Sequence, residues 1–163
     1  MVSPISHHSC PAPLREGLRM AEIETIAPSN LSVNPENPRL GEPNLGQRET
    51  LREIAENQKH KLVNLAKDIL EHGLNRSKLP IVTPHKSDQG KYTVLEGNRR
   101  IVALKALENP DTFVGVLDAR QLDQLRELSK QYLKDPIDSV LCAVVKDSAD
   151  AFHWMQLEHT GEN

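Results

Sequence analysis

Hydrophobic and polar positions follow two different periods along the chain, and the change of period predicts where strands and helices lie. Residues 21–27 alternate well enough for a short strand. Between 48 and 72 the apolar residues recur at intervals of three and four, which predicts helix. The polar stretch at 56–60 indicates a division into two helices, and Gly73 is a suitable C-cap for the second.

The second half of the chain continues this mixture. Strands are predicted at 79–84, 91–96, 112–117 and 137–145. Helices are predicted at 98–108, 119–134 and 147–158, the last with Ala151, Phe152 and Met155 pointing inward. Intermixed strands and helices predict an α+β (mixed α/β) fold, a single compact domain with a small mixed sheet and flanking helices.

Two further segments lack either period. Residues 1–20 mix Pro, Ser and His and are predicted to be a flexible lead-in, which leaves 21–163 as the domain. Residues 31–44 contain two Asn-Pro dipeptides. Proline disfavours the helical conformation in the residue before it, so this segment is predicted to be a rigid, extended loop that carries Arg39.

Composition restricts the function more than the fold. A length of 163 residues fits one domain, and only 3% of the residues are aromatic, so the core is predicted to consist of Leu, Ile, Val and Ala. The net charge of −3 argues against a protein that coats DNA through general basicity, so any anion site must be local. Two cysteines without metal-ligand spacing, no membrane-length apolar run and no signal-peptide core favour the cytoplasm.

The most informative stretch is the strand-to-helix junction Glu96-Gly97-Asn98-Arg99-Arg100. The first turn of a helix presents unpaired amides and a positive dipole end, and both favour anions. Glycine allows a phosphate to approach the backbone closely, and arginine side chains provide planar donors for it. The junction therefore predicts a phosphate cradle. The alternative is a surface helix whose arginines are solvated or paired with Glu96 and Glu108.

These residues also carry a resemblance to a known family. VLEGNRRIVALKAL, residues 94–107, resembles the second sequence box of the ParB/sulfiredoxin-like domain, in which a strand leads into Gly-x-Arg-Arg and a helix. VNPENPR, residues 33–39, resembles the first box, and AFHWMQLEHTGEN, residues 151–163, resembles the third, in which a helix ends in Glu-Asn. The order and separation of the boxes fit, and the resemblance covers roughly 21–163.

The resemblance implies a pocket for a nucleoside triphosphate, CTP or ATP, with Mg²⁺. Carried over by position, its phosphate and nucleotide residues are Gly97, Asn98, Arg99, Arg100, Asn34, Asn37, Arg39 and Thr160. Glu162 and Asn163 would hold the Mg²⁺, an ion that suits oxygen ligands. Glu96 is the catalytic candidate: it would orient either an arginine or a water near the terminal phosphate.

Departures from the family pattern restrict which members of the family this chain can resemble in function. Sulfiredoxins have a cysteine inside the glycine–arginine box, whereas this chain has Asn98 there and places Cys142 in a predicted buried strand, which argues against a sulfinic-acid reductase. The chain leaves no room for the helix-turn-helix and dimerisation domains of chromosome-partitioning ParB. Its third box ends at Asn163 without the usual Gln-Arg. These departures indicate a separate bacterial branch, often found in defence or mobile-element settings, and a domain trimmed from a longer protein.

Three functions remain open at this point. The first is a nucleotide-binding NTPase switch of a DNA-associated or phage-defence protein, which forms a homodimer or contacts DNA through a missing C-terminal region. The second is a nuclease or small-molecule kinase on the same scaffold, with Glu96 or Glu36 as its base. The third is a non-catalytic DNA- or protein-binding domain that uses a local basic patch of Arg39, Arg76, Arg99 and Arg100.

Overall fold

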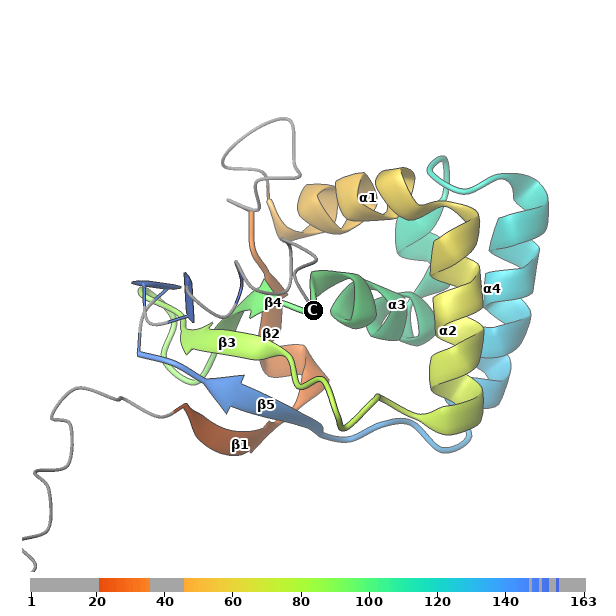
Figure 1. Cartoon of the computed structure of the whole chain (residues 1–163). Helices are drawn as coiled ribbons and strands as arrows, with labels where there is room; N and C mark the ends of the chain where they lie inside the picture. The colour runs from red at the N-terminus through yellow and green to blue at the C-terminus, as the bar shows by residue number, and fades with distance from the viewer. Residues whose placement is uncertain (1–20, 36–45, 147, 150, 153–154, 156–163) are drawn as a thin grey trace, which may run out of the picture.

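The computed structural model describes residues 21–35 and 46–146 and the separate positions 148, 149, 151, 152 and 155. A five-stranded sheet lies beside a layer of helices (Figure 1). The strands are β1 (Glu22–Ile26), β2 (Leu31–Val33), β3 (Ile81–Pro84), β4 (Tyr92–Glu96) and β5 (Val140–Val144). The helices are α1 (Gln47–Gln58), α2 (His60–His72), α3 (Asn98–Glu108) and α4 (Ala119–Tyr132), with 3-10 turns η1 (Pro28–Asn30) and η2 (Pro110–Phe113). The predicted mixed α/β fold with one small sheet is confirmed.

The sheet is mixed, and it is strongly curled. Its strand order is β1-β5-β3-β4-β2, with β1/β5 and β3/β4 antiparallel and β3/β5 and β2/β4 parallel. In a flat sheet the two edge strands would lie about 19 Å apart, at ~4.8 Å per strand. Residues 27–30, which join β1 to β2, include η1, and a 3-10 turn rises only ~2 Å per residue. The link is too short for a flat sheet, so the edges bend toward each other.

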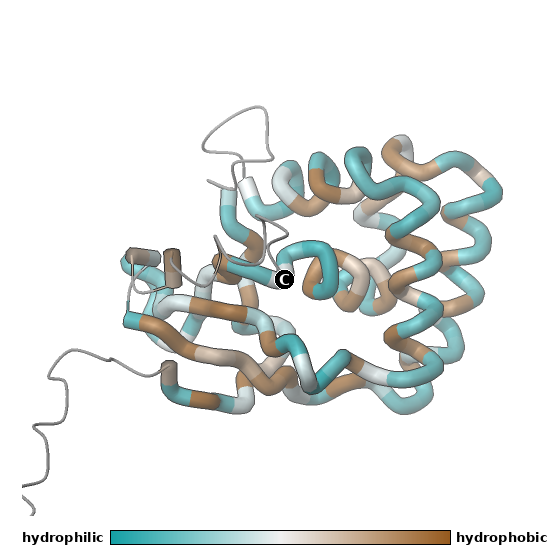
Figure 2. Tube along the Cα trace, in the orientation of Figure 1, coloured by the Kyte–Doolittle hydropathy of each residue, from teal (hydrophilic) through white to brown (hydrophobic). Residues whose placement is uncertain are grey.

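A side-chain hydrogen bond supports this curvature. The Tyr92 hydroxyl on β4 donates to the Glu24 carboxylate on β1 at 3.0 Å, although two strands lie between them in the sheet order. This bond and the burial of the phenol beside Glu24 raise the pKa of Tyr92. The bond thus links two strands across the curve of the sheet. The main hydrophobic core takes residues from both the strands and the helices, and Figure 2 shows hydrophobic residues along both.

Helix α3 runs through the middle of this core. Its fully buried positions are Ile101, Val102, Ala103, Leu104, Ala106 and Leu107. A helix that is apolar on all sides must be covered on all sides, and α3 contacts α1, α2, α4 and β2. This finding corrects the alternative in which 98–108 was a surface helix: only the first turn and the last residues of α3 reach the surface.

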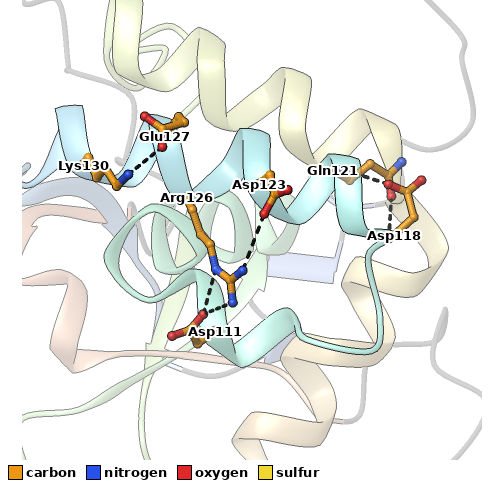
Figure 3. Close-up of polar contacts among 7 residues, drawn as sticks. All are labelled: Asp111, Asp118, Gln121, Asp123, Arg126, Glu127 and Lys130. Carbon is orange, nitrogen blue, oxygen red and sulfur yellow. Dashed lines mark hydrogen bonds and ion pairs between the residues drawn. The ribbon is translucent and has the colours of Figure 1, made fainter.

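The helix boundaries follow local chemistry. The polar stretch at 56–60 divides α1 from α2 as predicted, and the chain turns at Lys59, whose φ is 38°. Gly73 ends α2 as predicted, with φ 73° and its amide bonded to the Ile69 carbonyl at 2.8 Å. At the start of α4, Asp118 and Gln121 form a reciprocal capping box (Figure 3).

An exposed ion-pair group joins α4 to η2. Arg126 contacts Asp111 at 2.8 Å and Asp123 at 3.6 Å (Figure 3). Exposed pairs of this kind contribute little to stability, typically ~0–1 kcal/mol. Arg126 can therefore be replaced without serious loss of the fold, a property that is useful for control variants.

Three sequence predictions fail. The strand predicted at 112–117 is instead η2 and a loop, in which the Arg52 guanidinium donates to the Thr112 and Val114 carbonyls at 2.8 Å each. Conversely, the loop predicted from residue 31 onward begins with β2. Phe152 does not point inward, since it is 59% exposed, whereas Ala151 is buried. Residues 1–20, predicted to be a flexible lead-in, lie outside the described residues.

Ala151 belongs to a second, smaller cluster. It packs with Leu95 of β4 and Val145 beyond the end of β5, and Met155 lies against them. In the part of the chain that the structure describes, no helix has both the length and the apolar composition needed to cross a membrane.

Candidate phosphate-binding site

The junction between β4 and α3 is built around Gly97. Its φ of 92° lies in the left-handed region, which glycine adopts without the usual penalty. A Cβ added there would lie 3.3 Å from the Pro80 Cα and 3.2 Å from an Arg100 Nη atom. The amides of Arg100 and Ile101 already bond to the Gly97 carbonyl at 3.0 and 3.2 Å. The amides before them are helix-start donors without an intrahelical acceptor.

Asn98, the first residue of α3, is 6% exposed and hydrogen-bonded on both sides. Its Oδ1 accepts from the Asn34 amide at 3.2 Å, and its Nδ2 donates to the Leu95 carbonyl at 3.4 Å. The structure thus places Asn34 of the first box against Asn98 of the second box. The side chain of Asn98 thus contacts protein groups through both its oxygen and its nitrogen, and its backbone amide is a further donor at the start of α3.

The end of β2 is held from the other side by Gln47, the first residue of α1. Its side-chain amide accepts from the Val33 amide at 2.9 Å and donates to the Val33 carbonyl at 2.8 Å, as a neighbouring strand would. Both α1 and α3 therefore begin at the carboxyl end of β2 (Figure 1). Each helix start carries about half a positive charge, so the local field there favours an anion.

The two arginines differ in their surroundings. Arg99 is exposed, and within the described part of the chain no hydrogen bond or ion pair reaches its guanidinium. Arg100 is half-buried, lies against Gly97, and donates through Nη1 to the Lys78 carbonyl. One arginine thus extends from the first turn of α3, and the other joins that turn to the loop before β3.

Gln47 and Lys78 were not among the residues that sequence reasoning singled out. The helical periodicity from residue 48 predicted α1, but nothing in the sequence indicated that the start of this helix would reach Val33. The Lys78 contact uses a backbone carbonyl, which any residue type supplies. Both contributions arise from tertiary packing, and a single sequence carries no signal for them.

Two ionisable groups near α3, one half-buried and one buried, serve the structure. Lys105, two turns into the helix, donates to the Pro28 carbonyl of η1 at 3.1 Å, and burial lowers its pKa. It is therefore tied to η1. Cys142 on β5 lies in the core, where burial raises the pKa of its thiol to about 11 against the opposing charge of Arg100. A thiol with a raised pKa is a poor nucleophile.

The raised pKa of Cys142 gives a pH dependence of stability. Below the ordinary value of 9.0 the thiol is neutral in both states; above it the unfolded chain ionises first, so stability falls until the folded pKa of about 11. A rise of the thiol pKa from 9.0 to about 11 corresponds to a loss of at most about 3 kcal/mol in the free energy of unfolding. Urea unfolding at pH 8 and pH 10.5 should show a larger loss for the wild type than for Cys142→Ala. Equal losses in the two proteins would contradict the expectation.

Gly97→Ala should destabilise the fold by about 2 kcal/mol, from left-handed strain of ~1–2 kcal/mol and the contact with Pro80. Gly90→Ala is the matched control, since Gly90 has φ +83° but no heavy atom within 4 Å of an added Cβ. The Gly90→Ala variant should lose only the contribution of left-handed strain, about 1 kcal/mol of the free energy of unfolding. Urea unfolding of both variants measures the difference. Equal losses would show that Pro80 and Arg100 yield to the methyl group.

Several predicted site residues lie outside the described residues: Asn37, Arg39, Thr160, Glu162 and Asn163. The described residues contain Glu96, half-buried at the end of β4, together with Gly97, Asn98, Arg99, Arg100 and Asn34. No group of three or more His, Cys, Asp or Glu side chains that could hold a metal occurs among them. A cavity of about 390 Å³ lies elsewhere, lined by Arg48, Leu51, Asn109, Asp111 and Thr112, and contains none of the predicted site residues.

Comparison with known proteins gives a similarity of structure only. No family model and no curated protein sequence matches the chain. Among solved structures, it is similar to C-terminally truncated chromosome-partitioning protein ParB from Caulobacter crescentus complexed with CTP-γ-S, with 15% identity and a TM-score of 0.47 over 87% of this chain and 54% of that one. The same protein complexed to the centromeric parS site gives 17% identity and a TM-score of 0.39, over 84% and 48% of the two chains.

The chain spans about half the length of these ParB structures. Similarity at this level concerns the arrangement of strands and helices and does not identify a ligand for this chain. The sulfiredoxin side of the predicted superfamily has no counterpart among these two structures.

Proposed function

We propose that this chain is a nucleoside-triphosphate-binding module that holds the phosphates where α1 and α3 begin. The observation that supports this most is the meeting of two helix starts at the end of β2, with Gly97 at the turn and Arg99 extending from it. Exposed helix amides, a positive dipole end and a guanidinium are the donors that phosphate oxygens take. Because the whole chain carries a net charge of −3, attraction for an anion must come from this local site and not from the protein surface in general.

Three groups of residues would hold the nucleotide and its Mg²⁺. The backbone amides at the start of α3 and the guanidinium groups of Arg99 and Arg100 would take phosphate oxygens. Asn34, next to Asn98, would form the opposite wall together with Asn37, Arg39 and Thr160. Mg²⁺ keeps most of its ligands as water and phosphate oxygens and needs only one or two protein oxygens. Glu162 and Asn163 are oxygen donors of this type, a carboxylate and an amide.

The finer proposal is an NTPase switch, with CTP or ATP as the nucleotide. Glu96 would be the group that orients water or an arginine, because it immediately precedes Gly97. Binding would order the first and third boxes over the phosphates. This ordering would control homodimer formation and the pairing of the module with DNA in a cytoplasmic DNA-associated or phage-defence protein.

The test is calorimetric titration of the full chain with CTP, ATP, GTP and ADP, each with and without Mg²⁺. The proposal expects saturable binding of at least one triphosphate, weaker binding of ADP, and a gain in affinity with Mg²⁺. The identity of the base that binds most tightly names the nucleotide. Hydrolysis is then measured as released phosphate with that nucleotide. Absence of binding for every nucleotide, in a sample whose folding is verified by circular dichroism, would reject the proposed function.

A further inference from the structure

Asn98 stands out among the buried polar side chains of the described residues, which are Thr50, Asn98 and Ser129. Thr50 and Ser129 each donate a hydroxyl hydrogen bond to a backbone carbonyl, Thr50 within its own helix start. Asn98 instead joins the first turn of α3 to the chain just beyond β2, between positions 64 residues apart in sequence. A buried amide without partners is costly, so both of its hydrogen bonds favour this one arrangement.

The hydrogen bond between Asn34 and Asn98 also affects the direction of the chain after β2. Asn34 is followed by Pro35, which has no amide hydrogen and restricts Asn34 to extended backbone. The Asn34 amide is therefore the last backbone donor before the proline. Its bond to the Asn98 Oδ1 sets the direction in which the chain leaves β2. The first box starts at this point, so one side chain of the second box fixes where the first box begins.

Gln47 holds the preceding residue in a complementary way. Its side-chain amide pairs with both the N–H and the C=O of Val33. Val33 and Asn34 are thus clamped between the first residue of α1 and the first residue of α3. The clamp is made of two neutral amides, so it orders the backbone without competing for charge with an anion at the same place.

From these contacts we infer that Asn98 is a positioning residue of the nucleotide site: its side chain preorganises Asn34 against the start of α3 and does not itself take phosphate. This inference rests on the proposed function. A site that is ordered before its ligand arrives loses less conformational freedom on binding, so preorganisation increases affinity. Gln47, the first residue of α1, holds the end of β2 through its two hydrogen bonds to Val33.

The test compares Asn98→Ala, Asn98→Asp and Gln47→Ala with the wild type by two independent measurements. The first is amide hydrogen exchange at Val33 and Asn34 by NMR in the nucleotide-free protein. The second is calorimetric affinity for CTP and ATP with Mg²⁺. Asn98→Ala should speed exchange at Asn34 at least tenfold and weaken binding about tenfold. Gln47→Ala should speed exchange at Val33 and weaken binding less, since its contacts are only part-buried.

Asn98→Asp separates positioning from direct contact. It keeps an oxygen that accepts from the Asn34 amide, so exchange there should remain close to the wild-type rate. Its negative charge opposes a triphosphate, so its affinity should rise as the pH is lowered and the carboxyl is protonated. Slow exchange at Asn34 together with this pH-dependent recovery supports the inference, and a protonated carboxyl also restores a donor for the Leu95 carbonyl.

Different outcomes overturn different statements. If Asn98→Ala loses nucleotide affinity while exchange at Asn34 is unchanged, Asn98 contacts the ligand directly and the inference is wrong. If exchange increases and affinity is unchanged, the clamp is purely structural and the inference is again wrong. No binding of CTP or ATP by the wild type would reject the proposed function and this inference with it. Circular dichroism establishes that each variant is folded, and Gln47→Ala provides the second route if Asn98→Ala unfolds.

Discussion

Replacing Arg99 and Arg100 together by alanine should reduce the affinity for the bound nucleoside triphosphate by at least 100-fold. Two charge-assisted hydrogen-bonding groups would be lost, each worth about 1.5–3 kcal/mol, and a loss of ~2.7 kcal/mol already corresponds to a factor of 100. Calorimetry with the nucleotide that binds most tightly measures the change. Arg99 is exposed at the first turn of α3, so its removal leaves the core intact.

The matched control removes two arginines from a different helix. Arg120→Ala/Arg126→Ala takes the same charge from α4, which lies on the far side of the helical layer from the start of α3 (Figure 1). Its affinity should stay within about twofold of the wild type, because exposed charges separated by more than a Debye length of ~8 Å are largely screened. An equal loss of affinity in both double variants would mean that general charge, and not the α3 site, attracts the nucleotide.

The largest loss of stability is expected for Leu104→Ala in the middle of α3. Leu104 is 0% exposed, and Leu→Ala at such a position costs about 2–5 kcal/mol through lost burial and the cavity left behind. Because α3 contacts α1, α2, α4 and β2, the surrounding elements are constrained from several sides and the cavity cannot collapse easily. We therefore expect a value in the upper half of that range, measured as the free energy of unfolding in urea.

Leu133→Ala is the control for this variant. Leu133 sits at the C-cap of α4 and is 58% exposed, so the same truncation there should cost less than about 1 kcal/mol. The difference between the stability losses of Leu104→Ala and Leu133→Ala measures the contribution of burial. A loss of less than 1 kcal/mol for Leu104→Ala would contradict the central position of α3 in the core. Added nucleotide should raise the stability of Leu104→Ala by mass action if the α3 site binds it.

The sequence predicted most helices and the junction correctly, because local rules dominate there. The three- and four-residue spacing of apolar positions identified α1, α2 and α4, and Gly73 marked the end of α2. Gly97 was singled out as a position where a phosphate could approach the backbone, and the structure adds that its φ is 92°. Helix α3 was identified from Ile101, Leu104 and Leu107, but the spacing alone left open whether it was a surface helix.

The failures have physical causes. The stretch 112–117 is rich in apolar side chains like a buried strand, yet Pro110 starts a 3-10 turn and Arg52, 60 residues away in sequence, donates to the carbonyl of Thr112. Residues 31–33 appeared to belong to the Asn-Pro loop, but β2 is short and gains its order from β4 on one side and Gln47 on the other. In each case a distant side chain supplies the hydrogen bonds that decide the local structure.

The candidate site was predictable only in part. Exposed donors such as Arg99 follow from the motif itself, since a helix start beside glycine is a local feature. The engagement of Asn98 with Asn34, and of Arg100 with the Lys78 carbonyl, depends on which elements the fold brings together. The resemblance implied a phosphate contact for Asn98, and its hydrogen bonds to the Asn34 amide and the Leu95 carbonyl could not be predicted from the sequence.

The position of β5 has a consequence for how this chain acquires its structure during synthesis. β5 (Val140–Val144) lies between β1 and β3 in the sheet, although it is the last of the strands that the structure describes. Until residue 144 leaves the ribosome, the edge of β3 that faces β5 has no partner and β1 has no neighbour at all. Unpaired strand edges favour association between chains. We therefore expect nascent chains that stop before β5 to depend on chaperones, and the completed chain to become protected in a single late step.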